Sequence, residues 1–115
     1  MIEIGHSLEK IVEGAIHLKQ VRKSDLQYGD LVLITTRNSV YSVRVLDNDL
    51  YLVSGGWFDK KGMSPVKTTI AGCTWGGSII KIDIIAACGL CLEFGNRVIT
   101  STIQKVCLIR YGSQN

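Results

Sequence analysis

The side chains with the most reactive chemistry in this sequence belong to its four cysteines, Cys73, Cys88, Cys91 and Cys107. Cys88 and Cys91 form a CxxC pair, and four thiolates are a common ligand set for zinc. Zinc ribbons, however, carry two such pairs, whereas the other two cysteines here stand alone. In a continuous strand, positions 88 and 91 would also point to opposite faces of the sheet. Because apolar residues surround the pair, we expect the cysteines to fill the core, with no metal and no cofactor bound.

Histidine is the next candidate for chemistry, but neither His6 nor His17 stands at a spacing typical of a catalytic site. The sequence has no nucleophile elbow, no HExxH zinc motif and no Gly-Lys-Ser/Thr phosphate loop. Gly76-Gly77-Ser78 is too short for such a loop and precedes an expected strand rather than a helix. We therefore assign no catalytic residue, and the sequence favours a protein that is not an enzyme.

The residues that best match a ligand-binding site are Arg37, Asn38 and Ser39, at the tip of an expected hairpin. A tight turn needs Asn or Gly but has no need of Arg, whereas a recognition loop does. Lys60 and Lys61 form a basic pair in a second expected loop. These five residues are the candidate ligand-binding set. The alternative is that both loops simply face solvent and that Arg37 pairs with an acid of a neighbouring strand or subunit.

Nucleic acid is one ligand that such residues could bind, because small β domains often hold single strands between aromatic and basic side chains. The aromatic residues available are Tyr28, Tyr41, Trp57, Phe58 and Trp75, and the basic ones include Arg37, Arg44, Lys60 and Lys61. Only 7% of the chain is aromatic, and Tyr41 and Trp75 resemble core or corner residues. The sequence therefore allows nucleic acid as a partner but does not favour it.

Composition limits the class of protein further. The chain has 115 residues, 46% of them hydrophobic, and a formal charge of +3. This length suits one domain, residues 1–115, that buries its own core. The high apolar content and the open edges expected of a small β fold predict a homo-oligomer. The longest uncharged apolar run, 84–92, is too short to cross a membrane, and no secretory signal is present, so we expect a cytoplasmic protein with reduced thiols.

The elements that position these residues are predicted from the spacing of apolar side chains. Between Ser7 and Gln20 the apolar residues recur every three or four positions, which predicts an N-terminal helix over 7–20. From residue 26 to 110 the period is two, which predicts seven or eight short strands. Segments in this region include strands at 31–36, 41–45, 50–53, 97–102 and 103–109 and a loop at 59–67. The expected fold is mainly β, a small barrel or roll with one N-terminal helix.

The stretch 69–94 has the strongest strand character, and it contains a glycine-rich corner. We expect Gly72, Trp75, Gly76 and Gly77 to shape this corner, because glycine reaches backbone conformations that other residues avoid. Apolar runs lie on either side of it. The role expected of these four residues is structural, not chemical.

Several short segments stand in a fixed order along the chain: Gly29-Asp30, 36–41 (TRNSVY), Val45-Leu46-Asp47, 72–78 (GCTWGGS), Lys81 and Thr100-Ser101. In this order they resemble a family of small bacterial proteins with a TRNSxY … GST-aromatic-GGS … K … TS pattern. The resemblance covers roughly Gly29 to Val106 and implies no activity, because the family has no known function. Cys73 stands where that pattern has Ser. The function that the sequence favours is a non-enzymatic structural or interaction module that self-associates; the alternative is a β-barrel domain that binds nucleic acid or a small ligand.

Overall fold

The computed structural model describes residues 15–75 and 79–111 and shows a mainly β protein, which confirms the predicted class. One layer is a six-stranded antiparallel sheet in the order β1 (Ala15–Leu18), β11 (Ile103–Ile109), β3 (Leu31–Thr36), β4 (Val40–Val45), β5 (Tyr51–Gly55) and β6 (Val66–Thr68). Two smaller sheets accompany it: β10 (Cys91–Phe94), β7 (Ile70–Trp75) and β8 (Ile79–Lys81) form one, and β2 (Gln20–Arg22) and β9 (Ile84–Ala87) form the other. The described helices are short, a 3-10 turn η1 (Lys23–Asp25) and α2 (Gly56–Lys60).

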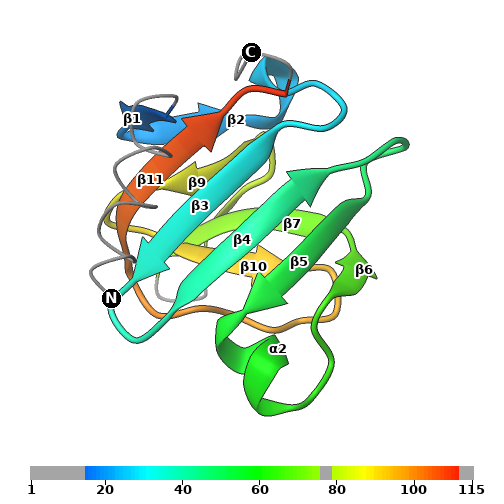
Figure 1. Cartoon of the computed structure of the whole chain (residues 1–115). Coiled ribbons are helices and arrows are strands. Elements are labelled where there is room, and N and C mark those ends of the chain that lie inside the picture. Colours follow the sequence, from blue (N-terminus) through cyan, green and yellow to red (C-terminus); the bar gives the residue numbers. More distant parts are fainter. Residues whose placement is uncertain (1–14, 76–78, 112–115) are drawn as a thin grey trace, which may run out of the picture.

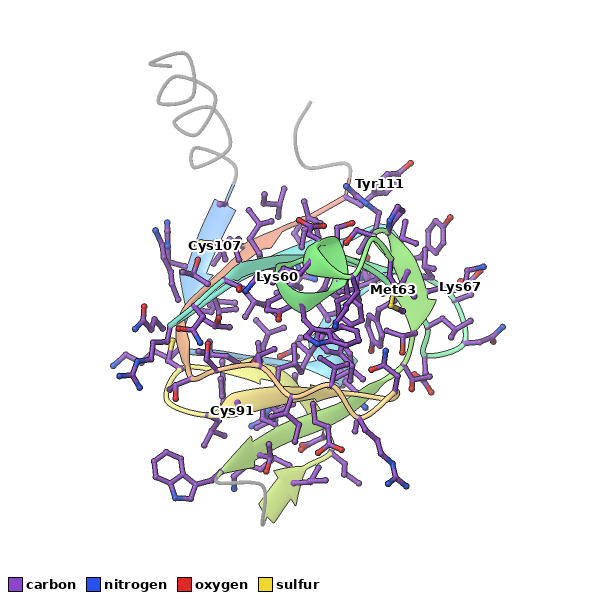
Figure 2. The ribbon with its side chains drawn as sticks, turned by 90° about the horizontal axis from the view of Figure 1, so that it is seen from below. Lys60, Met63, Lys67, Cys91, Cys107 and Tyr111 are labelled. Atoms are coloured by element: carbon purple, nitrogen blue, oxygen red, sulfur yellow. The ribbon has the colours of Figure 1, made fainter. Side chains whose placement is uncertain are left out.

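The core lies between the layers. Figure 1 shows β7, β9 and β10 behind the large sheet, and Figure 2 shows side chains filling the space between the two layers. Alternate residues of β3 and β4 face this core, as the period of two predicts. Val32, Ile34 and Val43 are completely buried, and Val53 joins them from β5. All four positions of β9 are buried, which accounts for its unbroken apolar sequence.

The predicted N-terminal helix over 7–20 is wrong for residues 15–20, and its first part lies outside the described residues. Residues 15–18 form β1, which pairs with β11 from Ala15 opposite Ile109 to Leu18 opposite Val106. Without β1, the long strand β11 would be left at the edge of the sheet with unpaired backbone groups. Pairing with β11 outweighs the helical spacing of the segment, because intrinsic helix preference is a weak determinant beside tertiary contacts.

The predicted fold is a barrel or a roll, and no closed barrel is found among the described residues, because the sheets stay open. Within the described part of the chain, β1 and β6 end the large sheet and each pairs on one side only. The second layer is built of strands of three to six residues that form two separate sheets. Irregular pairing also interrupts the ladders of β2 with β9 and of β10 with β7. Ladders this short and irregular do not link the layers into one continuous cylinder.

Two local departures from the predicted strands shape one end of the molecule. The segment 97–102 is irregular rather than a strand, with an isolated bridge between Glu93 and Ile99. The predicted loop over 59–67 overlaps the end of the helix α2 and the start of β6. Figure 1 shows α2 at one end of the large sheet, close to the end of β5. The candidate site is built from these two segments and the tip of the β3–β4 hairpin.

Candidate functional site

A cleft of about 160 Å³ opens at the end of the molecule where α2 lies. Three elements line it: the β3–β4 hairpin, α2 and the irregular segment before β11. The lining residues are Asn38, Ser39, Tyr41, Trp57, Lys60, Ile99, Thr100 and Ser101. Asn38, Ser39 and Lys60 belong to the ligand-binding set predicted from the sequence, and the fold brings them to one place.

Backbone hydrogen bonds fasten the hairpin tip to the segment before β11. The Arg37 N–H donates to the Thr102 carbonyl at 2.8 Å, and the Asn38 N–H donates to Ser101 Oγ at 3.0 Å. Within the tip, Thr36 Oγ1 accepts the Ser39 N–H and donates to the Ser39 carbonyl, both at 3.0 Å. The Asn38 and Ser101 positions, 63 residues apart in sequence, therefore form one wall of the cleft.

The opposite wall depends on the glycine pair that joins β5 to α2. Gly55 and Gly56 have φ values of 103° and 47°, which few other residues adopt. A Cβ atom on Gly56 would overlap Cζ of Tyr41, so the glycine leaves room for the phenol. The Trp57 N–H at the start of α2 then donates to Tyr41 Oη at 3.2 Å. The same turn therefore places Trp57 and Lys60 beside the Tyr41 hydroxyl.

An aromatic cluster beneath the cleft holds Tyr41 rigid. Its ring packs against Phe94 at 5.7 Å and against Phe58 at 6.2 Å between ring centroids. Phe58 in turn packs edge-on against both Phe94 and Trp57. Such edge-to-face contacts stabilise the packing beyond area burial alone. Tyr41 is only 4% exposed, so its hydroxyl reaches the cleft from a fixed position.

The groups that face the cleft are mainly hydrogen-bond donors. Lys60 is a cation with three N–H donors, and the hydroxyls of Tyr41 and Ser101 each carry a proton while their oxygens accept backbone N–H groups. Among the eight lining residues, none is an Asp, Glu, His or Cys. Those are the side chains that most often act as general acids, general bases or nucleophiles. The arrangement suits recognition of an acceptor or an anion.

The other predicted binding residues lie near the cleft but do not line it. Arg37 is exposed at the hairpin tip. The Lys61 ammonium lies 5.8 Å from the centroid of the Trp57 ring, in a cation–π contact. It therefore covers part of the one tryptophan that borders the cleft.

The predicted glycine-rich corner lies elsewhere, on the β7–β8 hairpin. Gly72 lies within β7 at φ 138°, where a Cβ would overlap the Lys81 carbonyl oxygen. Trp75 ends β7 and is 63% exposed. Gly76 and Gly77 lie outside the described residues.

None of the four cysteines lines the cleft. Cys73 is buried, and burial raises the pKa of its thiol to about 11, so it is protonated at neutral pH. Cys88 is exposed, with Sγ 3.6 Å from the Gln104 carbonyl oxygen, and Cys107 Sγ lies 3.3 Å from His17 Nδ1. Among residues 15–75 and 79–111, no three Cys, His, Asp or Glu side chains gather as metal ligands would.

Five lining residues were not in the ligand-binding set predicted from the sequence: Tyr41, Trp57, Ile99, Thr100 and Ser101. A signal existed for four of them. Tyr41 and Thr100-Ser101 belong to the ordered segments of the family resemblance, and Trp57 was among the aromatic residues considered for nucleic acid. The sequence could not show that those segments meet, because the contact between Asn38 and Ser101 spans most of the chain.

No family model, curated protein or solved structure matches the chain. The family resemblance noted from the sequence therefore stays a prediction, and the function is inferred from the geometry of the cleft. In the part of the chain that the structure describes, no helix has the length and apolar character needed to cross a membrane.

Proposed function

We propose that this protein is a non-enzymatic interaction module that self-associates, and that the cleft between the hairpin tip and α2 is its recognition site. The observation that carries the proposal is the cleft itself, a small depression lined by hydrogen-bond donors and by none of the usual catalytic side chains. The four cysteines are all free thiols, which supports a reducing compartment such as the cytoplasm.

The size of the cleft supports a protein partner over a free small molecule. Small-molecule sites usually enclose about 300 to 1,000 Å³, whereas an apolar cavity of about 150 Å³ holds a molecule the size of benzene. At about 160 Å³, this cleft fits one side chain or one functional group. A single group gives useful affinity when the rest of a partner surface binds beside it.

Open sheet edges and exposed apolar side chains support self-association. On the β7–β8 hairpin, Trp75 is 63% exposed and Ile80 43%, and Ile82 in the turn after β8 is 70% exposed. β8 lies at the edge of its sheet and pairs with β7 alone among the described strands. Exposed large apolar residues and open edges are typical of surfaces that another chain covers.

Static light scattering of the purified protein over a range of concentrations tests this proposal. We expect the weight-average mass to exceed the 12.6 kDa of one chain and to rise with concentration. A mass that stays at one chain at every concentration would overturn self-association. Native mass spectrometry of the same sample measures whether any non-protein mass is bound.

Single-stranded nucleic acid is the second candidate partner, because Lys60 and Lys61 flank Trp57 as in many stacking sites. Two observations weigh against it. Lys61 already occupies one side of the Trp57 ring, and Trp57 is only 37% exposed. Salt-sensitive binding of an oligonucleotide by wild-type protein, lost in a Lys60→Glu/Lys61→Glu variant, would favour this candidate over the protein partner.

A further inference from the structure

We propose that the cleft is a carboxylate-binding site and that a second copy of this chain supplies the carboxylate from its Asp47–Asp49 turn. The inference rests on the self-association proposed above and names the contact that produces it. One copy would insert the turn between β4 and β5 into the cleft of the next copy, so that copies join head to tail.

The chemistry of the cleft selects an anion with two acceptor oxygens. Lys60 supplies positive charge, and the Asn38 amide and the Ser39 hydroxyl add neutral donors at the hairpin tip. None of the lining residues is acidic, so no lining side chain repels a carboxylate by its charge. Hydrogen bonds from a cation to a carboxylate are about twice as strong as those between neutral groups.

Tyr41 adds a further donor at the cleft. Its hydroxyl oxygen accepts the Trp57 N–H, and a tyrosine hydroxyl can donate its own proton while its oxygen accepts. Since Tyr41 lines the cleft, a ligand oxygen placed there would satisfy this donor.

The Asp47–Asp49 turn has the charge and shape that the cleft requires. Asp47, Asn48 and Asp49 are all exposed, and Asn48 and Asp49 have φ values near +60°, which makes the turn a narrow projection. The Leu46 N–H donates to the Leu50 carbonyl across its base at 2.9 Å, so the projection is held in place. An aspartate side chain is small enough for a cleft of about 160 Å³.

The two surfaces lie at opposite ends of β4, so they cannot meet within one copy. Tyr41 stands at the cleft end of the strand and Val45 at the other, next to the turn. Figure 1 shows α2 and the β4–β5 turn at opposite ends of the large sheet. Two different surfaces that fit each other at opposite ends form a heterologous contact, which joins copies head to tail.

Two blocked variants and their mixture test the proposal by light scattering and analytical ultracentrifugation. Lys60→Glu places a carboxylate at the cleft, and the double variant Asp47→Asn/Asp49→Asn removes the charges of the turn while keeping residues that tolerate positive φ. We expect each variant alone to associate at least about tenfold more weakly than wild type. Lys67→Glu carries the same charge change on β6, away from Lys60 in Figure 2, and should associate as wild type does.

The mixture of the two variants gives the decisive result. Lys60→Glu keeps an intact turn and the Asp variant keeps an intact cleft, so an equimolar mixture should form a 1:1 dimer and nothing larger. Association of both variants at wild-type strength would overturn the inference. If Ile82→Lys abolishes association instead, the contact lies on the β7–β8 hairpin, the inference is wrong and the proposed self-association stands. A monomeric wild type would overturn the proposed function itself. Circular dichroism of each variant shows that its fold is intact.

Discussion

At the scale of single residues, a buried polar cluster outside the cleft is centred on Asp30. Its carboxylate is 1% exposed and accepts three hydrogen bonds, from the Gln27 N–H at 2.9 Å, the Tyr111 N–H at 3.0 Å and Arg110 Nη1 at 2.8 Å. Burial by itself raises the pKa of Asp30, but these three donors outweigh burial and leave the pKa below its usual value. The charged form is therefore the one that the fold stabilises.

This lowered pKa predicts how stability depends on pH. A carboxyl group whose pKa is lower in the folded state contributes stability above its unfolded pKa, and this contribution disappears as pH falls through the folded pKa. We expect Asp30→Asn to lower the free energy of unfolding at pH 7 by about 2 to 3 kcal/mol, because a buried partner of Arg110 loses its charge. We also expect the variant to lose less stability than wild type between neutral and acidic pH.

Urea unfolding at a series of pH values measures both effects. Asp25→Asn is the matched control, because Asp25 is exposed and uses its backbone carbonyl, not its carboxylate, to bind Arg110. The control should change stability by less than about 0.5 kcal/mol. An Asp30→Asn protein whose acid sensitivity equals that of wild type would show that another group controls unfolding in acid.

At the scale of elements, the junction of β5 and α2 decides whether a cleft exists. Gly55 ends the strand and Gly56 begins the helix, and both have positive φ. The Gly55 N–H donates to Asp59 Oδ1 at 3.1 Å, which ties the strand end to the helix. The absence of a side chain at Gly56 lets the Tyr41 phenol reach the Trp57 N–H. The backbone conformation at this junction therefore determines where the Tyr41 hydroxyl lies in the cleft.

Two glycine substitutions separate the cost of a positive φ from the cost of an overlap with Tyr41. Gly56→Ala adds both backbone strain and an overlap with Tyr41, whereas Gly62→Ala adds strain alone, because φ is +67° there and no atom lies within 4 Å of the new Cβ. We expect Gly62→Ala to cost about 1 kcal/mol and Gly56→Ala at least about 2 kcal/mol more. Denaturant unfolding followed by tryptophan fluorescence measures both. Equal losses in the two variants would show that the Tyr41 phenol moves aside without cost.

At the scale of the whole molecule, the sheet separates two oppositely charged features. β4 has six residues and spans about 20 Å, with the donor-lined cleft at one end and the acidic turn at the other. A head-to-tail contact between them is ionic, and dissolved salt screens the attraction between exposed charges. An apolar contact through Ile80 and Ile82 would not weaken in the same way.

Salt dependence therefore distinguishes the two modes of association. We expect the weight-average mass of wild-type protein at one concentration to fall when sodium chloride is raised from about 0.05 M to about 0.5 M, as the Debye length shortens to a few ångströms. Light scattering at both salt concentrations measures the change. A mass that is constant or rises with salt would assign the contact to the β7–β8 hairpin instead.

The sequence by itself determined the features that depend on neighbouring residues. The apolar spacing placed β3 and β11 at the bounds that the structure shows, 31–36 and 103–109. Alternate side chains of β3 face the core, whereas residues 106–109 of β11 are all buried. The sequence also identified Asn38, Ser39 and Lys60 as candidates for binding, because Asn38 and Ser39 follow an arginine that a tight turn does not need and Lys60 belongs to a basic pair. Valine and isoleucine favour strands because their branched side chains pack well on a sheet, so neighbouring residues alone indicate these strands.

Tertiary structure decided the features that depend on distant partners. Residues 15–18 follow a helical spacing yet form β1, because the edge of β11 is adjacent only in the folded chain. The sheets stay open because short second-layer strands do not link them, which no local pattern reveals. The cleft likewise requires that Asn38 meet Ser101 and that Gly56 admit Tyr41. Such contacts join residues that are far apart in the sequence. They form only when the whole chain folds, so no local pattern predicts them.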